Sequence, residues 1–154
     1  MWIPWERDDP VLWHYPGRKS VGYFGAVRLR DGLGVFEKEA GMFDGDTFWR
    51  FLRRLRSTSA CTGRTVAVII DNARYHHARA HLEWRQEQAS EFALDYLPPY
   101  SPELNPVERV WKRTRRNCTH NVFFPTLKAV VEKVEAQFLK WSEPNEELAK
   151  LCAL

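Results

Sequence analysis

The sequence predicts an α/β fold, in which helices flank a mixed sheet, within one domain that covers residues 1–154. Two strand-like segments, 21–29 and 34–39, flank the hairpin-turn signal Asp31-Gly32. The continuously apolar run Val66–Ile70 and a second strand-like run at 92–97 enclose a helix-length segment. Other segments carry apolar residues at helical spacing, which predicts the helices that cover the sheet.

Each element follows from a local pattern. Because Val66–Ile70 contains no polar residue, it predicts a strand covered on both faces. We expect a helix of about 14 residues after Asn72 and a loose stretch at 142–147. Three more helices are predicted from stripes of inward-facing residues: Phe48, Phe51, Leu52 and Leu55; Val107, Val110, Trp111 and Thr114; and Leu127, Val130, Val131, Val134, Phe138 and Trp141.

The composition is that of an ordinary globular domain, with 44% hydrophobic and 28% charged residues and a net charge of +3. No apolar stretch approaches the ~18 residues that span a membrane, and no signal peptide is visible. Cys61, Cys118 and Cys152 show no paired spacing, which predicts reduced thiols. These features argue against a membrane protein and a disulfide-stabilised secreted domain, and they predict a cytoplasmic protein.

The most informative segment is the run Leu97-Pro-Pro-Tyr-Ser-Pro-Glu-Leu-Asn-Pro-Val-Glu-Arg-Val-Trp111. Three prolines near its start hold the backbone in extended and turn geometry. Asn105 is then a predicted helix N-cap, and Pro106 occupies the first helical position, where its missing N–H costs nothing. The loop therefore delivers Glu108 on the first turn of a helix, next to the positive end of the helix dipole.

A second acid, Asp71, ends the apolar run Val66–Ile70. A carboxylate at the end of a buried strand and another at a nearby helix start can converge on a metal ion. Each acid also has a structural interpretation: Glu108 stands at capping-box spacing from Asn105, and Asp71 or Asn72 can cap the helix that follows. The proline run favours the metal interpretation, because a cap does not need such a loop in front of it.

Both acids stand in segments that resemble a known family. The segment Asp71-Asn-Ala-Arg-Tyr-His-His77 and the proline run resemble the second and third acidic motifs of DDE transposases of the mariner-like superfamily, in its bacterial insertion-sequence branch. The run Val21-Gly-Tyr-Phe-Gly-Ala-Val27 and the helix at 48–55 are similar to the middle portion of that family. The resemblance covers nearly the whole chain.

This resemblance implies a ribonuclease H-like catalytic core that uses three carboxylates and two Mg²⁺ (or Mn²⁺) ions. Asp71 and Glu108 match the second and third acids, so both are expected to be catalytic residues and metal ligands. The resemblance also implies cleavage and strand transfer of DNA, with transposon ends and target DNA as the partners.

The first acid of the family lies on the first, central strand, and the sequence offers no convincing candidate for it. Asp8 and Asp9 precede a proline in an irregular stretch, Asp31 lies in the hairpin turn, and Asp44 and Asp46 open a helix. We therefore expect the C-terminal part of a catalytic domain. It would lack the first central strand and the preceding helix-turn-helix region, and it would be inactive on its own.

Basic residues accompany the third acid. Arg109, Lys112, Arg113 and Arg116 share the helix of Glu108, and we expect them to bind DNA phosphates. A second basic cluster, at 50–56, suits a solvated helix face equally well. Besides DNA, the expected partners are full-length transposase or a second copy of the chain, and the expected location is the cytoplasm, at the nucleoid when DNA is bound.

Three other interpretations remain beside the transposase fragment. The chain can be a non-catalytic module that binds DNA or full-length transposase and interferes with transposition. A different ribonuclease H-like nuclease is a further alternative, but the proline run argues against it. His77 and His81, four residues apart, suggest zinc, but two residues do not complete a zinc site.

Overall fold

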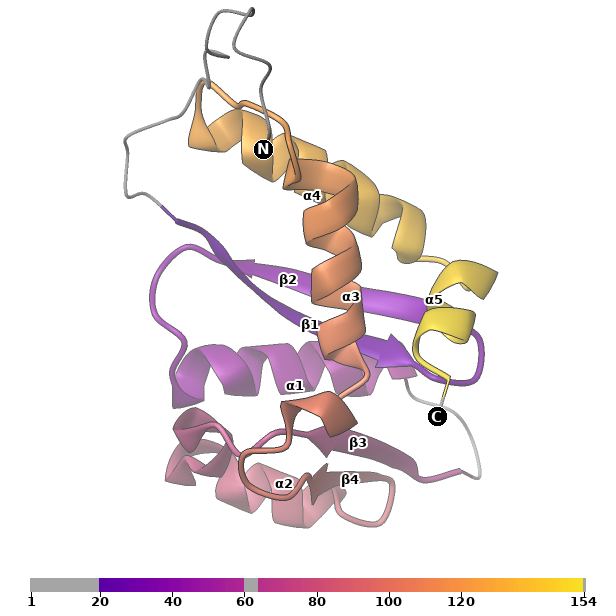
Figure 1. Cartoon of the computed structure of the whole chain (residues 1–154). Helices are drawn as coiled ribbons and strands as arrows, with labels where there is room; N and C mark the ends of the chain where they lie inside the picture. The colour runs from indigo at the N-terminus through magenta and orange to yellow at the C-terminus, as the bar shows by residue number, and fades with distance from the viewer. Residues whose placement is uncertain (1–19, 60–63, 154) are drawn as a thin grey trace, which may run out of the picture.

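The computed structural model describes residues 20–59 and 64–153, which form two pairs of strands surrounded by helices (Figure 1). Three residues that figured in the sequence analysis, Asp8, Asp9 and Cys61, lie outside the described residues. Cys118 and Cys152 are buried free thiols, as the sequence predicted. No helix of the described segments is long and apolar enough to cross a membrane.

The predicted antiparallel hairpin is confirmed, and it consists of β1 (Gly22–Arg28) and β2 (Leu33–Glu39). Because side chains alternate along a strand, each face of the hairpin has its own core. Phe24 and Val35 lie in one cluster of buried residues, and Phe36 lies in the other. The hairpin is thus the middle layer of the molecule, with helices on both of its faces.

The hairpin turn contains the aspartate that the sequence analysis excluded from the metal site. Gly32 has a φ of 73°, in the left-handed region that suits glycine. The Arg28 guanidinium donates hydrogen bonds of 2.7 Å to both carboxylate oxygens of Asp31 and so lowers the pKa of that carboxyl. Asp31 is therefore a turn residue, as predicted.

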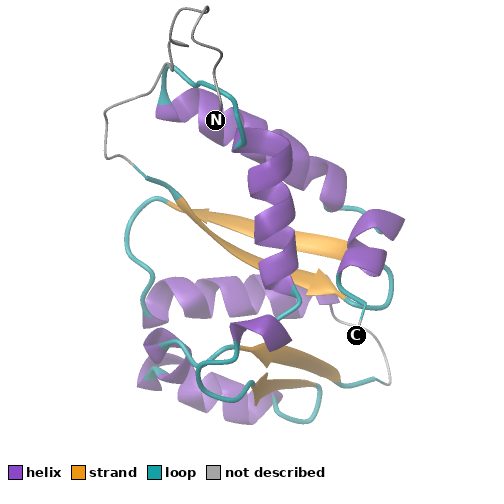
Figure 2. Cartoon of the chain, in the orientation of Figure 1, coloured by secondary structure: helices purple, strands orange, loops and turns teal. Residues whose placement is uncertain are grey.

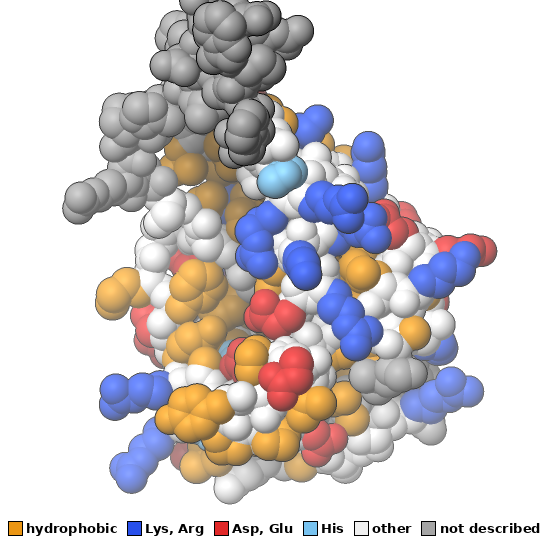
Figure 3. Space-filling model, viewed as in Figure 1, with side chains coloured by type: hydrophobic (Ala, Val, Ile, Leu, Met, Phe, Trp, Pro, Cys, Tyr) orange, Lys and Arg blue, Asp and Glu red, His pale blue; other side chains and the backbone are white. Residues whose placement is uncertain are grey.

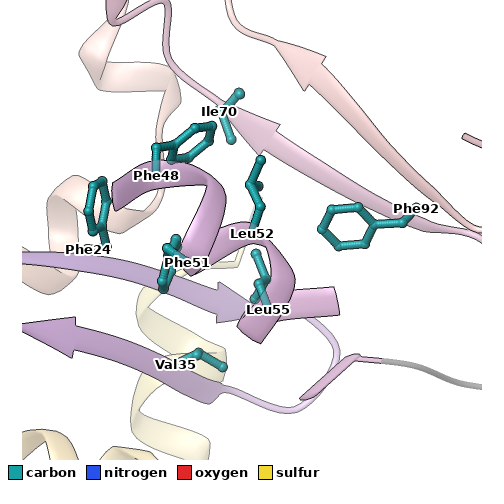
Figure 4. Close-up of a cluster of buried hydrophobic side chains, with 8 residues drawn as sticks. All are labelled: Phe24, Val35, Phe48, Phe51, Leu52, Leu55, Ile70 and Phe92. Carbon is teal, nitrogen blue, oxygen red and sulfur yellow. The ribbon is translucent and has the colours of Figure 1, made fainter. Parts of the chain in front are cut away.

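Helix α1 (Gly45–Ser59) lies between the hairpin and the second pair of strands (Figure 1). Asp44 caps it, because its Oδ1 accepts a hydrogen bond of 2.9 Å from the backbone N–H of Thr47. The buried side chains of α1 reach both strand pairs and join them into one core (Figure 4). The core cluster consists of Phe24, Val35, Phe48, Phe51, Leu52, Leu55, Ile70 and Phe92.

The basic residues of α1 form ion pairs rather than a free basic surface. Arg50 contacts Glu37 at 2.9 Å and Glu39 at 2.6 Å, and Arg54 contacts Glu37 at 3.4 Å. Arg53 lies over the ring of Trp49. The cluster at 50–56 is therefore a solvated face that ties the helix to its neighbours.

The second strand pair is parallel and joins β3 (Val66–Ile70) to β4 (Phe92–Tyr96). The prediction that this apolar strand is covered on both faces was wrong. One face contacts the core around α1, but Ala67 and Ile69 on the other face are exposed, Ile69 by 41%. The C-terminal helices contact the hairpin instead, so within the described segments nothing covers this face of β3.

The described residues form two separate two-stranded sheets rather than one mixed sheet (Figure 2). Within 20–59 and 64–153, β1 pairs with β2 alone, and β3 pairs with β4 alone. No described strand joins β1 to β3, where the first central strand of the family was expected.

The segment after Asn72 differs from its prediction. Instead of one helix of about 14 residues, it contains two 3₁₀ turns, Arg74–His77 and Arg79–His81, followed by α2 (Leu82–Gln88). The backbone is extended at Ala78, with ψ at 141°, and this ends the first turn. The aromatic and histidine side chains of the two turns pack on α1, and these contacts outweigh a weak helical pattern.

The C-terminal part follows its predictions with one addition. Helices α3 (Val107–Thr114) and α4 (Leu127–Trp141) are confirmed, and a π-helical turn, Arg115–Thr119, extends α3. A short helix, α5 (Glu146–Leu151), begins inside the stretch that was expected to be loose. Asn145 caps it by accepting a hydrogen bond of 2.8 Å from the backbone N–H of Leu148.

These helices cover the second face of the hairpin. Phe36 stacks on Phe138 of α4, with ring centroids 4.1 Å apart. Trp111 of α3 lies against Gly25 of β1, where a Cβ atom would clash with the indole ring. This close approach fixes α3, and with it Glu108, relative to the hairpin.

Candidate functional site

Asp71 lies directly after the last residue of β3. Its side chain is 51% exposed, and its Oδ1 accepts a hydrogen bond of 3.0 Å from the backbone N–H of Ala73. This is a local turn contact of the kind that aspartate commonly makes, rather than the cap of a long helix. The carboxylate therefore has one fixed oxygen and still faces solvent.

The buried side chain of His76 contacts the same carboxylate. The Nδ1 atom of His76 lies 3.0 Å from Asp71 Oδ1 and 2.9 Å from the backbone oxygen of Asp71. Burial lowers the pKa of His76, although the hydrogen bond and the charge of Asp71 oppose this shift. A neutral ring with its proton on Nδ1 donates to Asp71, an assignment that follows from the hydrogen-bond network.

This role of His76 was not evident from the sequence. Only His77 and His81 stood out there, because their spacing suggested zinc. His77 instead stacks on Tyr96 with ring centroids 4.4 Å apart, and His81 is buried with Nε2 3.3 Å from the backbone oxygen of Tyr75. The signal for His76 was its position five residues after Asp71, which becomes meaningful only when the intervening chain forms a turn.

Hydrogen bonds join the end of β3 to the start of the proline loop, residues 97–106. The Asn72 side-chain amide donates a hydrogen bond to the backbone oxygen of Leu97, and the Leu97 N–H donates to Ile70 O at 2.8 Å. The Tyr96 hydroxyl donates to the backbone oxygen of His76 at 2.9 Å. The turn that carries Asp71 and the loop that leads to Glu108 are thus fixed to each other.

The far end of the loop positions Glu108 as predicted. Asn105 is buried and extended, and its Oδ1 accepts a hydrogen bond of 3.2 Å from the Val107 N–H. Pro106 follows in helical conformation. The Glu108 side chain is exposed and makes no hydrogen bond or ion pair to the described part of the chain, so the capping-box interpretation does not account for it.

The structure thus anchors both ends of one loop, with Asp71 beside its start and Glu108 just beyond its end. Carboxylate oxygens are the ligands that Mg²⁺ and Mn²⁺ prefer, so the donor types fit a divalent cation. Residues 20–59 and 64–153 contain no group of three or more His, Cys, Asp or Glu side chains arranged to hold a metal. Within these residues, His77 and His81 therefore belong to no group of three ligands that could hold zinc.

The four basic residues that were expected to bind DNA, on α3 and its π-helical extension, have different surroundings. Arg109 donates hydrogen bonds of 3.2 and 2.9 Å to backbone oxygens at the end of α5, and Arg113 lies 3.7 Å from Glu147. Lys112 and Arg116 are exposed and form no ion pair with the described residues. Lys and Arg side chains gather over α3 in Figure 3, above acidic side chains on the same face.

Comparisons with known proteins agree with this architecture. Residues 2–131 match the family described as DDE superfamily endonuclease. The insertion element IS630 uncharacterized 39 kDa protein of Shigella sonnei is 30% identical over 120 residues, which are 77% of this chain and 34% of that protein. The uncharacterized protein y4pE/y4sA of Sinorhizobium fredii (strain NBRC 101917 / NGR234) is 33% identical over 105 residues, 66% of this chain and 70% of that protein.

A solved structure shares the fold. The match is to a chain of the Mos1 strand transfer complex, with a TM-score of 0.67 and 16% sequence identity, and it covers 99% of this chain and 44% of that chain. This chain spans about a third of the length of the IS630 relative and less than half of the Mos1 chain.

The fold is therefore a ribonuclease H-like α/β fold, the class predicted from the sequence. The chain belongs to the DDE superfamily endonuclease family and, within it, to the DDE transposases of the mariner/IS630 type. Members of this family generally use divalent metal ions.

Proposed function

We propose that the described residues are the C-terminal part of a transposase catalytic domain, which in complete form cleaves DNA and joins the strands. The observation that carries this proposal is the loop that fixes the Asp71 turn at its start and presents Glu108 just after its end. The match to an insertion-element protein and the fold shared with a strand transfer complex support the same reaction.

In this proposal Asp71 and Glu108 are metal ligands and catalytic residues. Each has an exposed carboxylate on a backbone that is fixed by hydrogen bonds. A bound Mg²⁺ or Mn²⁺ ion would lower the pKa of an attacking water or hydroxyl group and neutralise charge on the leaving oxygen. His76 orients Asp71, and its buried ring keeps water away from one side of the carboxylate.

We propose further that the third carboxylate and the strand that joins β1 to β3 come from outside the described residues. The two separate sheets support this proposal, as does the lack of a group of three ligands among residues 20–59 and 64–153. Two carboxylates hold one ion weakly and do not build a two-ion site. The described residues are therefore expected to be inactive without that further carboxylate.

The DNA partner in this proposal is bound through charge. Lys112 and Arg116 are exposed for phosphate contacts, whereas Arg109 and Arg113 are partly engaged with α5. Arg109 and Arg113 add positive potential at the same surface, even where they do not reach a phosphate.

The incomplete acid cluster also favours a second function. A chain that binds DNA or full-length transposase without cleaving DNA would compete with the active enzyme. The two functions differ in what happens when an upstream segment with an Asp-bearing strand is added. A catalytic part would gain cleavage, whereas a non-catalytic module would not.

The experiment is a cleavage assay on transposon-end DNA with Mg²⁺ and, separately, Mn²⁺. The chain alone should give no cleavage above background. The chain joined to the upstream segment should cleave, and Asp71→Ala or Glu108→Ala should abolish that cleavage. Cleavage by the chain alone that is lost in both variants would show that another acid completes the site, and the proposed truncation of the site would be wrong.

A further inference from the structure

Tyr100, near the middle of the proline loop, is fully exposed. Its ring makes no contact with other rings of the described residues. Its φ is 58°, in the left-handed region that residues other than glycine seldom adopt. A large aromatic side chain held outward on an unfavourable backbone is a feature that often marks a binding or active site.

The loop around Tyr100 is fixed rather than loose. Its start is tied to β3 through Leu97, and its end is the buried cap residue Asn105. Between them, the Leu104 N–H donates to Ser101 O at 3.2 Å, and the Asn105 N–H donates to Pro102 O at 3.0 Å. The backbone of the loop is therefore held on both sides of Tyr100, so less backbone entropy is lost when the ring contacts a ligand.

The chemistry around the loop indicates what the ring contacts. The loop leads from the end of β4, which is hydrogen-bonded to the end of β3 before Asp71, to the helix of Glu108, and Leu104 in the same loop is 49% exposed. Basic side chains over α3 lie on the same face of the molecule (Figure 3). Cations that bind phosphates next to an exposed aromatic ring are the combination with which proteins hold single-stranded DNA, since each base offers a flat face for stacking.

We propose that Tyr100 stacks on an unpaired base of the DNA strand that is bound at the candidate metal site. This inference rests on the proposed function and adds to it a preference for DNA with a single-stranded end or an unstacked base. It assigns Tyr100 a positioning role: the ring holds the base next to the phosphate, and it takes no part in the chemistry.

The test compares binding of two DNA molecules at low salt. One is a duplex with a single-stranded tail that carries 2-aminopurine, and the other is a blunt duplex with the same number of phosphates. The variants are Tyr100→Phe, Tyr100→Leu and Tyr100→Ala, with thermal unfolding by circular dichroism as the check on folding. Leu139→Ala, which truncates an exposed apolar side chain of α4, is the matched control.

We expect the Tyr100 variants to change binding of the duplex with the single-stranded tail and not of the blunt duplex. Tyr100→Ala and Tyr100→Leu should weaken binding of the tailed duplex by about fivefold or more, and Tyr100→Phe should not. Quenching of 2-aminopurine should be lost in the same two variants. Binding of the blunt duplex should be unchanged in every variant, and Leu139→Ala should behave as the wild type.

Several results would overturn the inference. If Tyr100→Ala binds the tailed duplex as tightly as the wild type, the inference is wrong. It is also wrong if Tyr100→Leu binds the tailed duplex as well as Tyr100→Phe, because the ring would then not act by stacking on a base. Loss of self-association in Tyr100→Ala, with DNA binding intact, would make the loop a protein contact. If the wild-type chain binds neither DNA, the proposed function itself fails, whereas the other results leave it standing.

Discussion

The Nδ1 atom of His76 lies 3.0 Å from the Oδ1 atom of Asp71, so a buried ring supports a half-exposed candidate metal ligand. The same ring contacts Phe48 of α1, with ring centroids 4.2 Å apart. Phe48 belongs to the core that joins the two strand pairs (Figure 4). The candidate site and the core are therefore one packed unit.

Replacing His76 should destabilise the fold as well as the site. His76→Ala removes a buried ring beside Phe48 and leaves the Asp71 turn unsupported, so we expect a loss of about 1–3 kcal/mol in the free energy of unfolding. Urea denaturation measures this loss. His77→Ala is the control, because His77 is exposed and its removal should cost less. An equal loss in both variants would contradict the supporting role of His76.

Stability should fall as the pH is lowered from 7 to 5. Burial lowers the pKa of both His76 and His81 below the ordinary value of 6.5. Below pH 6.5 the unfolded chain therefore binds protons that the folded chain does not, and stability decreases by at most about 1.4 kcal/mol per pH unit for each histidine. Above pH 7 both histidines are neutral in the folded and in the unfolded chain, so they no longer make stability depend on pH.

Thermal unfolding between pH 8 and pH 5 checks this expectation. The lowered pKa values of Asp31 and Asp44 act in the same direction, but only below about pH 4, so they do not interfere. His76→Gln should flatten the curve between pH 6.5 and 5, even though the variant is less stable at pH 7.5. A curve that rises as the pH falls through this window would show that the histidines are charged in the folded state.

Binding of duplex DNA should depend on salt through Lys112 and Arg116. Replacing both with alanine removes two phosphate contacts, so the slope of log affinity against log salt should decrease by roughly 1–2. The control is Lys128→Ala with Lys150→Ala, which removes the same charge from lysines that pair with glutamates on their own helices. Equal changes in the two double variants would mean that only net charge matters and that α3 has no special role.

The isolated chain should self-associate. In the described segments β1 and β3 each pair with a single strand, and each unpaired buried backbone group costs about 1–3 kcal/mol. Light scattering after size exclusion, together with thermal unfolding, tests this expectation. Ile69→Lys places a charge on the exposed face of β3 and should reduce association. A wild-type chain that stays monomeric would contradict the expectation.

Local signals were sufficient for most of the fold. Asp31-Gly32 marked the hairpin turn, Asn105-Pro106 marked the start of α3, and helical spacing marked α1 and α4. Each of these depends on neighbours in the sequence, so sequence patterns capture it. The helix α5 was missed because six residues are too few for periodicity, although its Asn145 cap was visible.

The remaining features depend on contacts between distant segments. The helix expected after Asn72 is broken because its rings pack on α1, and no local pattern reports that contact. For the same reason, the sequence did not show that His76 supports Asp71 or that Arg109 donates hydrogen bonds to the end of α5. The apolar run of β3 predicted two covered faces, but apolar composition does not show which neighbours are present.

The central claim is that Asp71 and Glu108 are both metal ligands, and Mn²⁺ binding followed by electron paramagnetic resonance tests it most directly. The variants are Asp71→Asn and Glu108→Gln, which keep the shape of each side chain, with Glu103→Gln as a control acid in the same loop. We expect both site variants to lose most of the Mn²⁺ binding of the wild type, and the control to keep it. Wild-type binding in either site variant, or an equal loss in Glu103→Gln, would contradict the claim.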